Sequence, residues 1–428
     1  MTDLSFFDYI KDFKWVDPDF FDSIRFDIAN IIYYYGEHFS NPLEKSSHKR
    51  KGLKKKIINI LLKDYRIYKI ITSRDIKKEP KIISNSYFKV NDELRKLGYN
   101  VYQPPWVLSY REKIVATFSL LKEIKYFKNF LANRNFNEIF TLEFQNKVGL
   151  LKETLKKFYS EQNILALFVP FDLNFFENIL IKVFKELQIP SFLFLHGIPA
   201  WYNNIDNNRV DYLIVWGEII KELFIKAGVQ EEKILVTGHP YYSYNHVKDL
   251  RFDLSDILVI TKPISGATSS DRTLLTDRSC ILLYLYQIQS ALKKFGVKTV
   301  RFRPHPSENL NWYLKFLDTS FFKQDSESIQ YSLKRSSLVI GPTSTVFIDA
   351  LCNGVNYLVY EPSHNNLDML HNEIAPPFDG TYSEIPVAKN EDELISILEN
   401  KVKINESITE KFIKTPFDIA IVKEFIRK

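Results

Sequence analysis

Short apolar runs alternate with longer amphipathic stretches along most of this chain. In its first part, the apolar runs that have the length of buried strands lie at 81–84, 99–102, 164–169, 191–195, 211–215 and 233–236. Helical spacing of apolar residues occurs at 17–39, 52–71, 90–97, 110–133, 136–160, 175–187 and 218–227. Strands that alternate with helices predict a parallel sheet covered by helices on both faces.

The same alternation begins again near residue 255. Strand-length runs lie at 256–261, 298–302, 337–340 and 357–360, and helical spacing occurs at 272–295, 344–352 and 416–428. The segment 241–252 lacks periodicity and carries mixed charge, so we take it as a linker.

The expected fold class is therefore α/β, with two Rossmann-like, doubly wound parallel-sheet domains that face a cleft. We expect a first domain over 1–240, with extra N-terminal helices, and a second over 250–412. The remaining segment, 413–428, is expected to form a helix that packs back on the first domain.

Composition agrees with two large cores. A chain of 428 residues with 45% hydrophobic and 15% aromatic side chains exceeds one ordinary core and is not disordered. Its two cysteines, Cys280 and Cys352, exclude a disulfide framework and suggest thiols in a reducing compartment. The N-terminus lacks a basic segment followed by a long apolar run, and no stretch reaches about 18 apolar residues. We therefore expect a cytoplasmic protein.

The net charge of +6 matters less than one dense basic run at 48–56. The interpretation we favour is a solvated helix start. The second is contact with the anionic surface of the inner membrane, which would make the protein peripheral there. The third is nucleic-acid binding, and no nucleic-acid fold signature accompanies the run, so we expect no nucleic-acid partner.

Two polar segments follow predicted strands of the second domain. Arg303-Pro304-His305-Pro306 comes after the strand at 298–302, and Gly341-Pro342-Thr343-Ser344-Thr345 comes after the strand at 337–340. Open α/β sheets place ligands at the carboxyl ends of their strands. A histidine held between prolines, and hydroxyl groups at a helix start, are suited to a phosphate. These segments predict a nucleotide site.

Each candidate of the second domain also has a plainer interpretation. Arg303 would bind phosphate bidentately or form a surface ion pair. The hydroxyls of Thr343, Ser344 and Thr345 would donate to phosphate, or one of them would only cap the helix that follows. Glu361 would accept a ribose hydroxyl or be a solvated loop carboxylate. The loop containing Ser265 and Gly266 would line the cleft or be a flexible polar loop.

The acceptor side offers three candidates for a general base. His196 follows a predicted buried strand and precedes Gly197, and its ordinary pKa suits proton transfer near neutrality. Asp172 lies beyond the strand at 164–169, where it would face the same cleft or cap the next helix. Glu37, beside Gly36, is the weakest of the three.

Several segments resemble known bacterial enzymes. Leu195-His196-Gly197-Ile198-Pro199 resembles the His-Gly turn of surface-polymer transferases, including the CDP-glycerol glycerophosphotransferases. The segment 236–242 is similar to the Gly-x-Pro segment that enters their C-terminal domain. Arg303-Pro304-His305-Pro306 and Thr343-Ser344-Thr345 resemble the His-Pro and Ser/Thr motifs of sialyltransferases, polysialyltransferases and Kdo transferases. The similarity covers residues 160–365 and implies the GT-B fold.

The resemblance implies a glycosyltransferase. In the sialyltransferase group the His-Pro and Ser/Thr residues contact the phosphate and ribose of a CMP-sugar, which assigns Arg303, His305, Pro306 and the hydroxyl triplet to the donor. Those enzymes usually carry an acidic pair before a glycine as the base. This chain has no such pair, which leaves both the donor and the base open, with His196 and Asp172 as the residues we select for catalysis.

The expected reaction is inverting transfer of a CMP-linked acidic sugar, such as sialic acid or Kdo, to a capsule, lipopolysaccharide or other surface glycan or glycolipid. The alternatives are transfer of glycerol phosphate from CDP-glycerol, a UDP-sugar transferase or 2-epimerase, and a non-catalytic nucleotide-sugar-binding scaffold. No Asp-x-Asp follows a strand, and the histidines and cysteines are dispersed, so we expect no metal and no cofactor beyond the donor.

Overall fold

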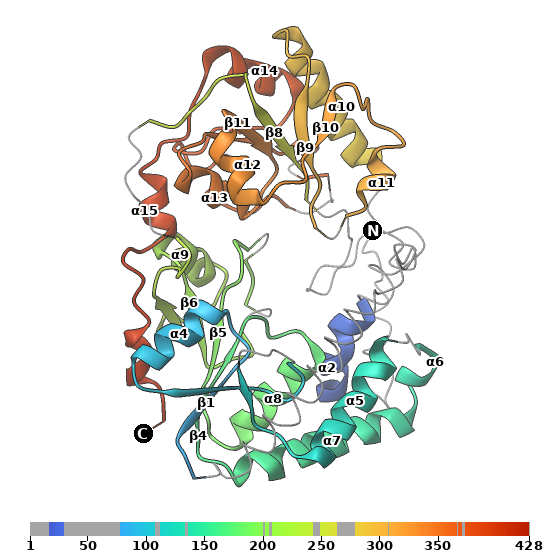
Figure 1. The fold of residues 1–428 in the computed structure, drawn as a ribbon, viewed down its shortest axis with the longest axis vertical. Coiled ribbons are helices and arrows are strands. Elements are labelled where there is room, and N and C mark those ends of the chain that lie inside the picture. The colour runs from blue at the N-terminus through green and yellow to red at the C-terminus, as the bar shows by residue number, and fades with distance from the viewer. Residues whose placement is uncertain are drawn as a thin grey trace, which may run out of the picture.

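The protein folds into two bodies, each built on a parallel sheet (Figure 1). The computed structural model describes residues 17–29, 78–107, 112–132, 136–199, 202–204, 208–242, 249–262, 279–306, 308–365, 367–369 and 373–427. All statements below concern these residues.

The first domain has a seven-stranded sheet with the order β3-β2-β1-β4-β5-β6-β7. Every pairing in it is parallel. Its strands are β1 (Lys81–Ser84), β2 (Asn100–Gln103), β3 (Lys113–Ile114), β4 (Ile164–Val169), β5 (Ser191–Phe194), β6 (Tyr212–Val215) and β7 (Ile234–Val236). The order reverses between β1 and β4, which makes that point the topological switch of this sheet.

Helices cover both faces of the first sheet because their apolar residues recur at helical spacing. They are α2 (Pro18–Ala29), α4 (Phe88–Lys96), α5 (Phe118–Ala132), α6 (Phe136–Ile139), α7 (Leu142–Ser160), α8 (Phe175–Glu186) and α9 (Glu218–Lys226), with a 3₁₀ turn at Glu231–Lys233. Most of α8 is buried, including Phe175 and Phe184, and α2 packs against it. The hydroxyl of Thr141 caps α7 by accepting a hydrogen bond from the Phe144 N–H.

The second domain has a six-stranded parallel sheet with the order β10-β9-β8-β11-β12-β13. Its strands are β8 (Ile257–Ile260), β9 (Val300–Arg303), β10 (Phe322–Gln324), β11 (Leu338–Gly341), β12 (Tyr357–Tyr360) and β13 (Val387–Ala388). Its helices are α10 (Ser279–Lys294), α11 (Leu310–Tyr313), α12 (Ile329–Arg335), α13 (Val346–Cys352), α14 (Glu391–Asn400) and α15 (Ile408–Phe412). The switch point lies between β8 and β11.

Two doubly wound parallel sheets confirm the predicted fold class. The sequence pattern missed β3, β10 and β13, which have only two or three residues each. Strands this short carry too few residues for an alternation to be recognised. The predicted helix at 52–71 lies outside the described residues.

The chain returns to the first domain after α15 and runs down the left edge of that domain in Figure 1. The Lys414 N–H donates to the Trp216 carbonyl at 2.8 Å, and the Asp418 N–H donates to the Thr237 carbonyl at 2.8 Å. Near the end, the Arg427 N–H donates to the Leu165 carbonyl at 3.2 Å. The predicted helix at 416–428 is wrong in form: the segment holds only a 3₁₀ turn, Ala420–Glu424.

Gly238 makes this return possible. Its φ is +82°, and a Cβ there would lie 2.2 Å from the Lys414 carbonyl oxygen. Any other residue would be strained in this left-handed conformation and would also collide with the returning backbone. The Gly-His-Pro segment after β7 is therefore shaped by the crossing chain.

Candidate functional site

The carboxyl ends of β8 and β11 flank the switch point of the second sheet, where open α/β sheets bind ligands. Thr261 and Lys262 follow β8, and Thr343 follows β11 after Pro342. His305 follows the neighbouring strand β9, and Glu361 follows β12. The topology therefore brings the two sequence motifs and Glu361 to one edge of the sheet.

Glu308 organises the loop after β9. One carboxylate oxygen accepts the His305 N–H at 2.8 Å and the Thr261 hydroxyl at 2.5 Å. The other accepts the Tyr313 hydroxyl at 2.6 Å. Three donors on one carboxylate hold the backbone of His305 against the end of β8, while the His305 and Pro306 side chains stay exposed. The pKa of His305 is lowered, because partial desolvation by the surrounding protein disfavours the charged imidazolium.

A buried ion cluster occupies the switch point itself. The Lys262 ammonium lies 2.9 Å from Glu361 Oε2 and 2.6 Å from Asp368 Oδ2. Glu361 is fully buried, and its other oxygen accepts the Thr343 N–H. Burial disfavours the charged ammonium, but the two carboxylates outweigh that effect, so the pKa of Lys262 is raised. Glu361 is therefore not the solvated loop carboxylate of the plainer interpretation.

The cluster joins one ammonium to two carboxylates, which leaves one net negative charge. A surplus of carboxylate oxygens suits hydroxyl donors better than it suits a phosphate. The sequence motifs do not include Lys262 or Asp368. Lys262 could have been found from its position, because it directly follows the predicted strand at 256–261 and ligands bind at the carboxyl ends of such strands.

Two of the three hydroxyl side chains after β11 have partners in different places. The Ser344 Oγ accepts the Val346 N–H at 3.2 Å, which closes a local turn just before α13. The Thr345 Oγ1 instead accepts the Ile198 N–H of the first domain at 3.0 Å. The same oxygen lies 2.9 Å from the position of a Cβ at Gly197, so only glycine allows this approach. The Ser/Thr motif thus touches the His196-Gly197 turn across the interface.

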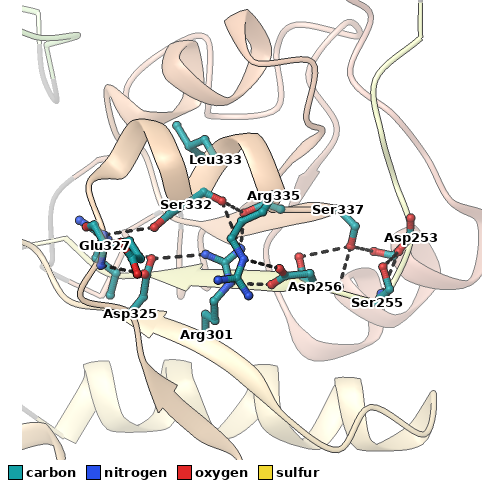
Figure 2. Close-up of polar contacts among 12 residues, drawn as sticks. Asp253, Ser255, Asp256, Arg301, Asp325, Glu327, Ser332, Leu333, Arg335 and Ser337 are labelled. Atoms are coloured by element: carbon teal, nitrogen blue, oxygen red, sulfur yellow. Dashed lines mark hydrogen bonds and ion pairs between the residues drawn. The ribbon is translucent and has the colours of Figure 1, made fainter.

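Arg303 lies in an ionic network on the α12 side of β9. Its Nε is 3.2 Å from Asp325 Oδ2, and its Nη2 donates to the Glu327 carbonyl and to Ser332. Figure 2 shows the rest of this network, in which Arg301 links Asp256 and Asp325. The guanidinium of Arg303 would have to exchange these partners before it bound phosphate bidentately.

His196 extends from the end of β5 into the interface. Its Nδ1 is 3.3 Å from the Pro170 carbonyl oxygen. A carbonyl only accepts, so Nδ1 carries the proton and Nε2 keeps its lone pair in the neutral ring. Burial lowers the pKa of His196, and the hydrogen bond to Pro170 opposes this only in part. A neutral imidazole with a free Nε2 is the protonation state that a general base requires.

Asp172 does not face the cleft, which corrects the prediction. Its carboxylate is fully buried and accepts the Arg209 N–H at 3.2 Å, with the Arg209 guanidinium 3.7 Å away. Arg209 also binds Asp22 of α2, with Nη2 and Oδ1 2.6 Å apart. Asp172 therefore helps to fasten α2 to the sheet, and it does not cap α8, which begins after Asn174.

A second buried acid lies at the switch point of the first sheet. Glu177 accepts hydrogen bonds from Asn85 Nδ2 at 2.6 Å and from Trp106 Nε1 at 2.9 Å. Nearby, Asp27 of α2 accepts the Phe175 N–H at 3.0 Å. Burial raises the pKa of Asp27 to about 7, and the charge of Glu177 adds to this shift. The sequence pattern could not predict that Asp27 and Glu177 lie near each other, because α2 and α8 are far apart in the chain.

One cavity of about 500 Å³ lies between the domains. The first domain contributes His196 together with residues after β1 and β7, and the second contributes residues of α12 and α13. The cavity confirms that the two sheets face a cleft, and it places His196 on its wall.

The remaining candidates lie outside the described residues: Glu37, the run 48–56, Ser265 and Gly266. Within the described ranges, no group of three or more His, Cys, Asp or Glu side chains is arranged to hold a metal ion. The helices in the same ranges include none with the length and apolarity needed to cross a membrane.

No model of a protein family matches this chain, and no curated protein is similar to it. Among solved structures, it is similar to the UDP-GlcNAc 2-epimerase of Methanocaldococcus jannaschii in complex with UDP-GlcNAc and UDP. The identity is 16%, the TM-score is 0.46, and the match covers 81% of this chain and 99% of that one. The UDP-GlcNAc 2-epimerase of Neisseria meningitidis bound to UDP-GlcNAc matches at 12% identity, with a TM-score of 0.45 and coverage of 81% and 99%. The wall teichoic acid polymerase TagF matches at 13% identity, with a TM-score of 0.38 and coverage of 85% and 90%. At these values the likenesses carry no argument about the reaction.

Proposed function

We propose that the protein is a glycosyltransferase that uses a nucleotide-activated sugar. The observation that carries the proposal is the contact between the Thr345 hydroxyl and the Ile198 N–H at 3.0 Å. It joins the phosphate-suited loop of the second domain to the His196 turn of the first. A donor held at the first loop would then present its sugar to a base on the second.

The donor side follows from the chemistry of each group. His305 is exposed and neutral, and it would donate one ring N–H to the phosphate of the donor. The hydroxyls of Thr343 and Ser344 would add donors. The Lys262–Glu361–Asp368 cluster, with its surplus of carboxylate oxygens, would lie beside the ribose hydroxyls. This arrangement assigns Glu361 to the ribose.

Transfer would proceed as one displacement. His196 Nε2 takes the proton of an acceptor hydroxyl, and the oxygen attacks the anomeric carbon from the side opposite the phosphate. The bond between that carbon and the phosphate oxygen breaks, and its electron pair leaves with the nucleotide. His305 stabilises the leaving phosphate, and the product has the inverted configuration.

We propose a CMP-linked acidic sugar as the donor, and a surface glycan or glycolipid as the acceptor, on the resemblance of the His-Pro and Ser/Thr motifs. CDP-glycerol and UDP-sugar donors are the alternatives. A UDP-sugar 2-epimerase needs carboxylates that flank the sugar. The pair at this edge, Glu361 and Asp368, is already neutralised in part by Lys262, so transfer is the better fit.

A thermal-shift panel with CMP, CDP, UDP and GDP tests the donor. A ligand that binds only the folded state at 100 times its Kd adds about 2.7 kcal/mol to stability. We expect CMP to raise Tm most in the wild type, and His305→Ala to reduce that shift. Selective stabilisation by UDP would overturn the donor assignment. Equal shifts in the wild type and in His305→Ala would remove His305 from the site.

A further inference from the structure

The interdomain cavity has a wall of aromatic rings, which come from the first domain and from the start of the segment that follows it. Tyr87, Tyr241 and Tyr242 line it together with His239. The rings of His239 and Tyr242 have centroids 4.5 Å apart, and those of Tyr87 and Tyr241 are 6.2 Å apart at 87°. This packing fixes the rings before any ligand arrives, so little side-chain entropy is lost on binding.

The opposite wall is polar and belongs to the second domain. Gln330 Nε2 lies 3.4 Å from Asp349 Oδ1, and Gln330 Oε1 accepts from Asn353 Nδ2 at 3.3 Å. Tyr242 also hydrogen bonds to Asp349, which connects the two walls. Two carboxamides and a carboxyl group offer both donors and acceptors at short spacing, which is what a ring of sugar hydroxyls requires.

The charges of the side chains that line the cavity favour neutral over acidic sugars. The side chains that line the cavity in the described part of the chain include no lysine or arginine. Lys89 lies beside the cavity, with its ammonium 4.4 Å over the Tyr241 ring and 3.3 Å from the Pro240 carbonyl. A bound carboxylate or phosphate would therefore be desolvated next to Asp349 without a cation on the lining to balance it.

We propose that this cavity is the acceptor site, and that it binds a neutral sugar at the end of the acceptor glycan. The inference rests on the proposed function, because it uses His196 on the cavity wall as the base. The ring of Tyr241 stacks on the apolar face of the sugar, the Tyr87 ring stands perpendicular to it at the border of the site, and Gln330, Asp349 and Asn353 bind the sugar hydroxyls. One hydroxyl then points at His196 Nε2.

A consequence concerns the length of the product. Once an acidic sugar has been added, the new end of the glycan carries a carboxylate that the cavity excludes. The enzyme then adds one residue and stops, instead of building a homopolymer of its donor sugar.

Direct binding of monosaccharides tests the site without any donor. The probes are methyl glycosides of galactose, glucose, mannose and N-acetylglucosamine, with the methyl glycosides of sialic acid and glucuronic acid as acidic probes. We expect saturation-transfer NMR to show that at least one neutral glycoside binds about tenfold more tightly than either acid. Failure of every neutral probe to bind, or tighter binding of an acidic one, would overturn the proposal.

Variants locate the binding. Tyr241→Ala should weaken the neutral glycoside roughly tenfold and raise the acceptor KM by the same factor, without changing donor affinity. Tyr241→Phe keeps the ring and should bind like the wild type. The control is Tyr286→Ala, since Tyr286 is 65% exposed on α10, away from the cavity. An acceptor KM that Tyr241→Ala leaves unchanged would contradict the site.

The acceptor site and the proposed function can each be refuted without the other. Binding of a neutral glycoside with no transfer from any nucleotide sugar would leave the site standing and remove the proposed function. Transfer with an acceptor KM that is insensitive to Tyr241 would keep the function and remove the acceptor site.

Discussion

Removal of the Lys262 ammonium is expected to destabilise the second domain strongly. In Lys262→Met the apolar stem remains, but Glu361 and Asp368 keep their charges in a site that is almost closed to solvent. Two unit charges about 3 Å apart interact by about 5 kcal/mol at an effective dielectric constant of about 20. Because desolvation of the ammonium offsets part of this, we expect a net loss of about 3–5 kcal/mol in the free energy of unfolding.

The loss should depend on pH in a defined direction. In the wild type the pKa of Lys262 is raised by folding, so its contribution is fully present below the unfolded value of about 10.4 and is lost as the pH rises through the folded value. The deficit of Lys262→Met should therefore be fully present at neutral pH and should shrink as the pH rises above about 10.4, where the wild type also loses the ammonium.

Urea unfolding of the wild type and Lys262→Met at pH 7.5 and at about pH 11 measures this. The matched control is Lys293→Met, whose pair with Asp318 has side chains 54% and 37% exposed. Its loss of stability should be small, because water screens an exposed ion pair. The triple variant Lys262→Met, Glu361→Gln, Asp368→Asn should recover much of the stability. Unfolding of Lys262→Met like the control, or an equal deficit at both pH values, would refute this electrostatic role of Lys262.

Three further predictions concern other parts of the molecule. Gly238→Ala should lower the free energy of unfolding by more than about 1 kcal/mol, because it strains the left-handed backbone and crowds the Lys414 carbonyl. The control in the same denaturation assay is Gly149→Ala, where a Cβ meets no atom within 4 Å. Folding raises the pKa of Asp27 to about 7, so the free energy of unfolding should fall as the pH rises from about 4 to 7. Asp27→Asn should remove this dependence, which amounts to up to a few kcal/mol. Equal slopes of unfolding free energy against pH in the wild type and Asp27→Asn would contradict this prediction. Transfer activity should persist in excess chelator, and complete loss that magnesium restores would show that the prediction of a metal-free reaction is wrong.

Much of the fold follows from the sequence because the strands are buried on both faces. Runs such as Ile164–Val169 and Leu338–Gly341 are apolar throughout, which marks them as interior parallel strands. The edge strands β3, β10 and β13 escaped the pattern because two or three residues carry no period. The C-terminal segment was taken for a helix on its apolar spacing, but its backbone hydrogen bonds go to the first domain.

The sequence predicted candidate site residues only where a reactive side chain lies close behind a predicted strand. His196 and His305 were found because each comes directly after a strand and beside a glycine or prolines. Asp172 satisfied the same rule, yet it is paired with Arg209, which lies 37 residues further along the chain. The pairing of Lys262 with Asp368, and of Thr345 with Ile198, depends on folding that brings separate loops together. No local pattern contains that information.

We propose that His196 is the base of a sugar transfer whose donor lies on the second domain. The most direct test compares product formation by the wild type and His196→Gln, with saturating CMP-sugar and a neutral acceptor, by mass spectrometry. We expect His196→Gln to bind the nucleotide like the wild type while kcat falls by about 10²–10⁴-fold. We also expect the wild-type rate to hold to a pH below 6.5, because the pKa of His196 is lowered. Undiminished kcat in His196→Gln would show that His196 is not the base.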